Sequence, residues 1–583
     1  MENDKKVLLS LKDLEVKFHV RGRILTAIRG VSLDIYENES LAIVGESGSG
    51  KSVLTKTFSG MLDSNGFISK GELQLYDDEL QDTVVKKTKI SNFIIDNVQK
   101  SLNKYSKYEF GADIYKEMLE LKAERERKIS LTDEEKATID DKISDLKYEK
   151  TELFNLKQTY DPKHEKDKIA EAKKQLAVYD KQIKELENKE KMIIKEHKAA
   201  LKADVEYNQK YNEKMASLKQ KYEEAITHEI TNETISRNFK LSKELYLSIG
   251  RYGLISKIKF TFRLKRALKN AMKLGVDLYT DESVNKVFDT VVFRVAYLDE
   301  DDEKIHGYCN LDLAKIKYTK DWQQIRGTRV ATIFQDPMTS LNPIITIGKQ
   351  ITSIIMKHQS CSANEARIRA IELMKKVGIP NAEKRFDDYP FQYSGGMRQR
   401  IVIAIALSCQ PKILVCDEPT TALDVTIQAQ ILKLIKDLQK EFNYTIVFIT
   451  HDLGVVANIA DRVAVIYAGQ IVELGTCEEV FYDPRHPYTW ALLSSLPQLA
   501  ERGTELYSIS GTPPSLYNKI VGDPFAPRNP YCLKIDTLKD SPMFKVTDTH
   551  YAKTWLLDPR SPKIEKPEII QDIHNKLIKV FNI

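Results

Sequence analysis

A short apolar run that leads into a glycine-rich loop is the feature that most restricts the fold of this 583-residue chain. Residues 41–44 have the composition of a buried strand, and the loop after them follows the pattern GxxxxGK[ST] before a helix-like run. Such a loop turns backbone N–H groups toward a phosphate, while its lysine adds positive charge and its hydroxyl can reach Mg²⁺. The loop consists of Gly45, Glu46, Ser47, Gly48, Ser49, Gly50, Lys51 and Ser52. The pattern predicts an α/β fold of the P-loop NTPase class that binds a nucleoside triphosphate with Mg²⁺.

Two adjacent acids follow another short apolar run. Residues 413–416 are apolar, and Asp417 and Glu418 come directly after them. A carboxylate at the end of a strand beside the P-loop can hold Mg²⁺ through water, and the next acid can meet the water that attacks the γ-phosphate. We therefore expect Asp417 to act on the metal together with Ser52, and Glu418 to be catalytic.

A third motif, Tyr393 followed by Ser394, Gly395 and Gly396, precedes the apolar helix of residues 401–407. With this motif the chain resembles the ATP-binding cassette (ABC) family, in which Ser-Gly-Gly acts across a dimer interface on the partner's nucleotide. The resemblance implies a RecA-like core, an antiparallel β subdomain and a helical signature subdomain. It also implies further roles: Gln335 senses Mg²⁺ and contacts the membrane partner, Asp424 forms the D-loop, His451 contacts the γ-phosphate, and Phe18 stacks on adenine.

Finer features resemble one branch of that family. Tyr393 and Met397 stand where many cassettes have Leu and Gln, and the segments 486–493 and 511–516 resemble the tail of oligopeptide and dipeptide permease ATPases. The resemblance is to the D subunit, which implies an ATPase that powers peptide uptake from the cytoplasmic face of the membrane as a peripheral subunit. It also implies a heterodimer with a second, F-type ATPase subunit, two transmembrane permease subunits and an extracellular peptide-binding lipoprotein.

The tail departs from many of these relatives at the four cysteines that hold an iron–sulfur cluster. The matching positions here carry Asp523, Asn529, Asp536 and Thr554, and Cys532 is out of register. Because such clusters need thiolate ligands, no iron–sulfur cluster is expected.

A Lys/Glu-rich zone separates the two parts of the cassette. We expect residues 1–78 and 312–480 to form one discontinuous nucleotide-binding domain, residues 79–311 an inserted helical domain, and residues 481–583 a C-terminal extension. A seam with spacings of three and four predicts an antiparallel coiled-coil hairpin, which begins at a capping box (Thr132 with Glu135) and breaks at residues 160–162. A single solvated helix or a disordered tract is the alternative. The seam comprises Ile139, Ile143, Leu146, Leu153, Leu156, Ile169, Ala172, Leu176, Tyr179, Ile183, Leu186 and Ile193.

Residues 251–273 contain eight Lys or Arg and no acid, interleaved with apolar residues. Such a segment can lie on an anionic membrane, bind an acidic partner, or pack as a helix with a solvated basic face. The sequence leaves these three alternatives open.

Charge, hydropathy and cysteine spacing argue against several other classes of protein. The formal net charge of +5 is too small to indicate nucleic-acid binding, no apolar window is long enough to span a membrane, and the N-terminus has no signal-peptide pattern. Six widely spaced cysteines include no CxxC pair. A soluble DNA-repair or chromosome ATPase of the SMC/Rad type, which also has a coiled coil after its P-loop, is the alternative function. The glutamine loop and the permease-type tail argue against it.

Overall fold

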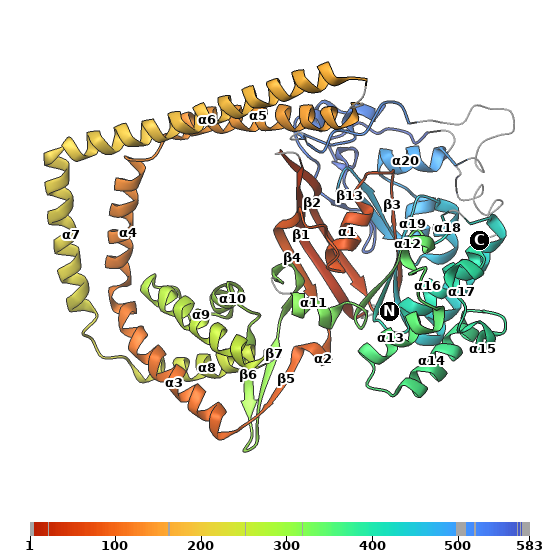
Figure 1. Ribbon diagram of the computed structural model, residues 1–583, viewed down its shortest axis with the longest axis horizontal. Helices are drawn as coiled ribbons and strands as arrows, with labels where there is room; N and C mark the ends of the chain where they lie inside the picture. Colours follow the sequence, from red (N-terminus) through yellow and green to blue (C-terminus); the bar gives the residue numbers. More distant parts are fainter. Residues whose placement is uncertain are drawn as a thin grey trace. The chain divides into compact units, whose positions relative to one another are not determined.

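The computed structural model describes residues 5–573 apart from 21–22, 161–163, 251, 317–318, 422, 497–508, 518–519, 568–569 and 572. It divides into two compact units (Figure 1). Unit 1 comprises Met1–Phe18, Ile24–Leu75 and Asp312–Ile583, and unit 2 comprises His19–Arg23 and Tyr76–Leu311. Apart from the short segment His19–Arg23, the chain leaves unit 1 after Leu75 and returns to it at Asp312.

The centre of unit 1 is an eight-stranded sheet in the order β14-β15-β13-β12-β3-β11-β10-β9. The pairs from β12 to β9 are parallel, whereas β13 is antiparallel to β12. The central strands β3 and β11 are buried at every position, as expected for parallel strands covered on both faces. The strands are β3 (Ser40–Val44), β9 (Val330–Ile333), β10 (Ile413–Asp417), β11 (Thr445–Thr450), β12 (Arg462–Tyr467), β13 (Gln470–Thr476), β14 (Phe544–Lys545) and β15 (Tyr551–Ala552).

A second sheet in unit 1 has the order β2-β1-β4-β8. Its strands are β1 (Val7–Val20), β2 (Arg23–Tyr36), β4 (Gly66–Leu75) and β8 (Leu311–Asp312). The Asp312 carboxylate accepts a hydrogen bond from the backbone N–H of Leu73 at 2.9 Å. The two ends of unit 1 that flank the insertion are therefore neighbours.

The helices of unit 1 complete its core. Helices α13, α14 and α16 pack on one another, and their apolar faces join the main sheet in one cluster. The helices are α1 (Lys51–Phe58), α11 (Thr319–Ile325), α12 (Pro337–Ser340), α13 (Ile347–His358), α14 (Ala363–Lys376), α15 (Ala382–Arg385), α16 (Gly395–Leu407), α17 (Val425–Phe442), α18 (Leu453–Ile459), α19 (Cys477–Tyr482) and α20 (Pro487–Ser494).

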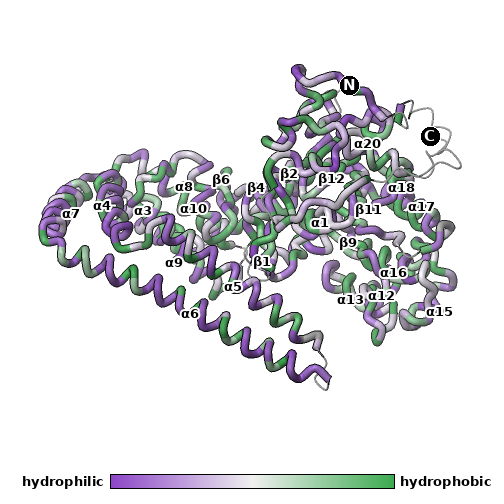
Figure 2. The backbone as a smooth tube through the Cα atoms, turned by 90° about the horizontal axis from the view of Figure 1, so that it is seen from above, coloured by the Kyte–Doolittle hydropathy of each residue, from purple (hydrophilic) through white to green (hydrophobic). Residues whose placement is uncertain are grey.

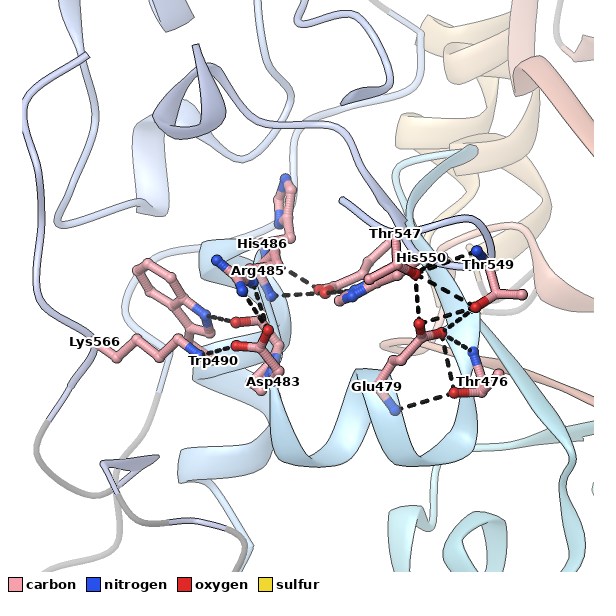
Figure 3. Close-up of polar contacts among 12 residues, drawn as sticks. Thr476, Glu479, Asp483, Arg485, His486, Trp490, Thr547, Thr549, His550 and Lys566 are labelled. Carbon is pink, nitrogen blue, oxygen red and sulfur yellow. Dashed lines mark hydrogen bonds and ion pairs between the residues drawn. The ribbon is translucent and has the colours of Figure 1, made fainter. Parts of the chain in front are cut away.

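Polar contacts hold the C-terminal segment to the sheet and to α19 (Figure 3). The Glu479 carboxylate on α19 accepts hydrogen bonds from the hydroxyls of Thr547 (2.5 Å) and Thr549 (2.9 Å), and Asp483 pairs with Lys566 at 2.5 Å. The described residues beyond 540 are thereby part of unit 1, with β15 paired to β13.

Unit 2 is mainly helical. Its described helices are α2 (Asp78–Gln81), α3 (Lys89–Ser106), α4 (Ala112–Arg127), α5 (Asp133–Thr159), α6 (Lys166–Ala203), α7 (Val205–Ala225), α8 (Asn232–Ile249), α9 (Leu254–Lys273) and α10 (Asp281–Asp289). It also contains a three-stranded sheet, β5-β7-β6, which the sequence analysis did not anticipate. The strands are β5 (Asp82–Lys86), β6 (Val295–Glu300) and β7 (Lys304–Cys309), and each is paired antiparallel.

Helices α5 and α6 lie side by side and are mostly hydrophilic along their length (Figure 2). Lys150 pairs with Asp180, and Leu146 lines the same hollow as Leu186, so the two helices run antiparallel. Helix α5 begins at the expected capping box of Thr132 and Glu135. The helices end and restart at Thr159 and Lys166, with the predicted break at Asp161 and Pro162 outside the described residues. Supercoiled packing of this pair stays a prediction.

Within the described part of the chain, no helix combines the length and apolar character needed to cross a membrane.

Candidate nucleotide-binding site

Three of the predicted motifs leave the main sheet at the same edge. The parallel register places Val44 beside Thr450, and Asp417 beside Ile449. The P-loop after β3, the acids at the end of β10 and His451 after β11 therefore meet, because carboxyl ends of parallel strands share one edge. Gln335 follows β9, the next strand after β10 in that sheet.

The P-loop backbone depends on its glycines. Gly50 has φ +104°, a backbone conformation that residues other than glycine rarely adopt. A Cβ at Gly45 would lie 2.2 Å from the carbonyl oxygen of Ile466, so a larger residue does not fit there. The Ser49 hydroxyl is buried and has no hydrogen-bond partner in the described structure. An unpaired buried donor inside a phosphate-type loop fits an anionic ligand.

Lys51 is buried and turned back over the loop. Its Nζ donates hydrogen bonds to the carbonyl oxygens of Gly45 (2.8 Å) and Glu46 (2.9 Å). Burial lowers the pKa of Lys51, while the nearby charges of Glu418 and Asp417 oppose that shift. A buried ammonium at this place is suited to bind phosphate oxygens.

Ser52 and Asp417 form the oxygen pair expected for Mg²⁺. The Ser52 hydroxyl donates to Asp417 Oδ1 at 3.1 Å. Burial raises the pKa of Asp417, while the hydrogen bond from Ser52 lowers it. Among the described residues no group of three or more His, Cys, Asp or Glu side chains could hold a metal by itself. One carboxylate and one hydroxyl fit Mg²⁺, which characteristically completes its shell with phosphate oxygens and water.

The Glu418 carboxylate contacts the other side chains that were predicted to be catalytic. Its carboxylate accepts hydrogen bonds from Gln335 Nε2 at 2.8 Å and from Thr421 Oγ1 at 3.1 Å, and it lies 3.2 Å from His451 Nδ1. Its backbone is left-handed, with φ +47°, and its N–H donates to the Ile449 carbonyl at 2.9 Å. The structure thus brings Gln335, Glu418 and His451 together.

The signature residues face solvent. Ser394 caps α16 by accepting a hydrogen bond from the Met397 N–H at 3.4 Å, and Ser394 and Gly395 are exposed. A Cβ at Gly396 would lie 2.8 Å from Ile427 Cγ2, so this glycine permits α16 to approach α17. Asp424 caps α17 through the N–H of Ile427 at 2.9 Å.

Phe18 lies on β1, in the four-stranded sheet and not in the sheet that carries the P-loop. It is opposite Gly66 in register, and a Cβ at Gly66 would lie 2.6 Å from Phe18 Cε1. The ring therefore covers Gly66, and its stacking on adenine stays a prediction.

Two residues that hold the P-loop, Arg528 and Tyr488, were not expected from the sequence. Arg528 donates to both carboxylate oxygens of Glu46, at 2.8 Å and 3.1 Å, and also to the Tyr467 hydroxyl at 3.1 Å. The backbone N–H of Glu46 donates to the Tyr488 hydroxyl at 2.8 Å. No local pattern links Arg528 to Glu46, since 482 positions separate them. Glu46 therefore helps to hold the P-loop in place, through its carboxylate and through its backbone N–H.

This arrangement defines the class of protein. A P-loop with a serine and an aspartate paired for Mg²⁺, a glutamate held between Gln335 and His451, and an exposed Ser-Gly-Gly helix start together define an ABC-type ATPase.

Comparisons with known proteins agree. The family model of the ABC transporter matches residues 28–243 and 296–421, and the model of the oligopeptide/dipeptide transporter C-terminal region matches residues 472–535. The oligopeptide transport ATP-binding protein AmiE of Streptococcus pneumoniae is 65% identical over 270 residues, which cover 46% of this chain and 76% of AmiE. The dipeptide transport ATP-binding protein DppD of Lactococcus lactis is 59% identical over 246 residues, or 42% of this chain and 70% of DppD. The oligopeptide transport ATP-binding protein OppD of Mycoplasma genitalium is 37% identical over 384 residues, or 58% of this chain and 95% of OppD.

The chain therefore belongs to the ABC transporter family, among the ATP-binding subunits of its oligopeptide and dipeptide branch. These similarities confirm the branch expected from the motifs, and they give no support to an SMC/Rad-type DNA ATPase.

Proposed function

We propose that this chain is one of two ATP-hydrolysing subunits that power the uptake of oligopeptides or dipeptides through an ABC importer. The observation that carries the proposal is the meeting of Gln335 and His451 on the carboxylate of Glu418, at the end of β10, which only β11 separates from the P-loop strand β3. Hydrolysis of a phosphoanhydride depends on positioning and electrostatics, and this group supplies both.

Each residue of the nucleotide site has its own role in the proposed reaction. Lys51 and the loop amides would bind the phosphates, and Ser52 and Asp417 would hold Mg²⁺. When bound, Mg²⁺ supplies positive charge that offsets the charge developing on the phosphate oxygens. Glu418 orients the attacking water, while Gln335, Thr421 and His451 fix the direction of its carboxylate.

The site needs a second cassette. Ser394 and Gly395 are exposed at the start of α16, where a helix N-terminus favours an anion, and no residue of this P-loop binds them in the described structure. We infer that they act on the nucleotide held by a second ATPase subunit of the F type. When the two ATPase subunits close and reopen, the region of Gln335 would transmit this movement to two permease subunits.

The proposed setting is the cytoplasmic face of the membrane. The branch to which the chain belongs implies permease partners, and peptide would reach the permeases from an extracellular binding lipoprotein. Affinity purification of the full chain from detergent-solubilised membranes tests this setting. We expect a second ATPase and two integral membrane proteins, and recovery of the chain alone would contradict it.

We also infer that the tail holds no iron–sulfur cluster. Each of the four positions uses an oxygen to cap a local turn: Asp523 accepts from the Phe525 N–H (2.9 Å), Asn529 from Tyr531 (2.9 Å), Asp536 from Leu533 (2.6 Å) and Thr554 from Leu556 (3.3 Å). These oxygens suit backbone donors, whereas such a cluster needs thiolates. Iron and acid-labile sulfide assays on anaerobically purified protein should give neither element, and stoichiometric amounts would refute the inference.

A further inference from the structure

Helix α9 (Leu254–Lys273) in unit 2 has two different halves. In its C-terminal half, Leu264, Leu268 and Met272 are fully buried. The helix packs beside α3 and α8. Lys269 lies over the ring of Tyr105, and Lys273 lies over the ring of Tyr108. The C-terminal half is therefore an ordinary packed helix.

The N-terminal half exposes large apolar side chains. Leu254 is 77% exposed, Ile255 84%, Ile258 54% and Phe262 71%. At 100° per residue, these four positions fall within an arc of about 100° on one side of the helix. A contiguous exposed apolar stripe of this kind marks a contact surface.

Basic residues border this stripe, and no acid interrupts it. Lys259, Arg263 and Arg266 are exposed and occupy the adjoining arc of the helix. The helix contains no Asp or Glu at any position. An apolar stripe with a basic border is the arrangement of helices that lie in the plane of a bilayer, where the apolar side chains enter the acyl boundary and the cations meet anionic headgroups.

We propose that the exposed face of α9 between Leu254 and Arg266 binds the surface of an anionic lipid membrane. Its charge selects an anionic surface, and its apolar side chains project from a single helix face and span about 12 Å of the helix, a shape suited to a fluid bilayer. The inserted unit would then give the ATPase a lipid contact of its own beside its permeases. The proposal goes beyond the proposed function, because binding to lipid requires neither nucleotide nor permease.

Vesicle co-sedimentation of the purified full chain tests the proposal. Vesicles of phosphatidylcholine mixed with phosphatidylglycerol should bind the chain at low salt, binding should fall at high salt, and vesicles of phosphatidylcholine alone should bind it weakly. Equal binding to both kinds of vesicle, or binding to neither, would overturn it.

Two variants separate the contributions of the surface. Ile255→Ser with Phe262→Ser should lower the vesicle partition coefficient at least about tenfold, because two exposed apolar side chains no longer enter the bilayer. Lys259→Gln with Arg266→Gln should lower it by a similar factor on anionic vesicles only. Both variants should bind ATP as the unaltered chain does, since both pairs are exposed and lie outside unit 1.

Matched controls use exposed residues on other helices of unit 2. Met192→Ser with Val205→Ser, and Lys173→Gln with Lys174→Gln, should leave vesicle binding unchanged. If the controls reduce binding as much as the α9 variants do, the surface is not specific to α9 and the proposal fails. If the α9 variants bind vesicles normally but no longer associate with solubilised permeases, the stripe contacts protein and the lipid assignment is wrong.

Discussion

Arg528, from the C-terminal extension, holds Glu46 of the P-loop by hydrogen bonds to both carboxylate oxygens, at 2.8 Å and 3.1 Å. Arg528 is 9% exposed, and the hydrogen bond to Glu46 raises its pKa against the effect of burial. The extension is therefore attached directly to the loop that we propose binds phosphate. In this protein, the C-terminal region and the nucleotide site share one polar cluster.

Breaking the pair of Arg528 and Glu46 should lower both the affinity for nucleotide and the stability of unit 1. For Arg528→Met we expect a loss of roughly 2–4 kcal/mol in unfolding free energy, because Glu46 is left without its partner in a mostly buried place. ATP affinity should fall as well, since the loop loses its support. Urea unfolding followed by Trp fluorescence reports on unit 1, which contains all three tryptophans.

A double-mutant cycle gives the control for this pair. Arg528→Met and Glu46→Gln together should cost less than the sum of the single changes, by on the order of 1–3 kcal/mol. Arg560→Met, at an exposed arginine that pairs with Asp558, should change little. Strict additivity at Arg528 and Glu46 would contradict the coupling.

Glu418→Gln should keep ATP binding and slow hydrolysis by about 10²–10³-fold, because an amide cannot polarise the attacking water as a carboxylate does. Thr421→Ala removes one of the hydrogen bonds to Glu418 and should reduce turnover only several-fold. Lys51→Ala should instead weaken ATP binding itself. Phosphate release and binding of a fluorescent nucleotide measure the two effects separately, and normal turnover by Glu418→Gln would exclude the role assigned to Glu418.

The stability of unit 1 should depend on the ionisation of Asp523. Burial raises the pKa of Asp523 to about 6, above the value of about 4 expected in the unfolded chain. Between these two pKa values the folded chain keeps a proton that the unfolded chain loses, so the free energy of unfolding falls as pH rises through that window. The loss is roughly 2–3 kcal/mol and is complete above about pH 6.

Asp523→Asn should remove this part of the pH dependence. Asparagine is uncharged and keeps an oxygen for the Phe525 N–H, so the variant should be the more stable protein near pH 7.5 and should lose less stability between about pH 4 and 6. The exposed Asp548 provides the control, because Asp548→Asn leaves the Asp523 contribution in place. The same slope in Asp523→Asn as in the unaltered chain would show that another group causes it.

The inserted unit should be dispensable for nucleotide binding. A short Gly/Ser linker in place of Tyr76–Leu311 can join Leu75 to Asp312, because Asp312 already hydrogen-bonds Leu73 in the neighbouring strand. ATP affinity should stay within about twofold, since every residue of the site lies in unit 1 and a short closed connection costs little free energy. A shortened protein that folds but does not bind ATP would make the insertion part of the nucleotide site.

Sequence reasoning succeeded where a motif carries its own local geometry. The strand before Gly45, the strand that ends at Asp417 and the helix that begins after Ser394 are fixed by neighbouring residues, and their meeting follows from the parallel sheet. The capping box of Thr132 and Glu135 is equally local.

It failed where the partner is remote or the signal is weak. The strands β6 and β7 of unit 2 are short and lie at the end of a Lys/Glu-rich zone that the composition predicts to be helical. Strand β6 pairs with β7, and β7 pairs also with β5, more than 200 positions earlier, so no local pattern predicts this sheet. The pairing of Arg528 with Glu46 exists only because the extension folds back onto the P-loop. For α9, periodicity showed an amphipathic helix but could not show which of its apolar residues are buried and which, like Ile255, are exposed.

The most direct test of the account is peptide uptake by the reconstituted transporter. The complete complex, with this chain and its proposed partners in proteoliposomes, should accumulate a labelled oligopeptide only when ATP and Mg²⁺ are on the side where this subunit lies. Glu418→Gln in this chain should reduce uptake by at least about tenfold without disassembling the complex. Unchanged ATP-driven uptake by that variant complex, or uptake by the unaltered complex without ATP, would contradict the central claim that this site powers transport.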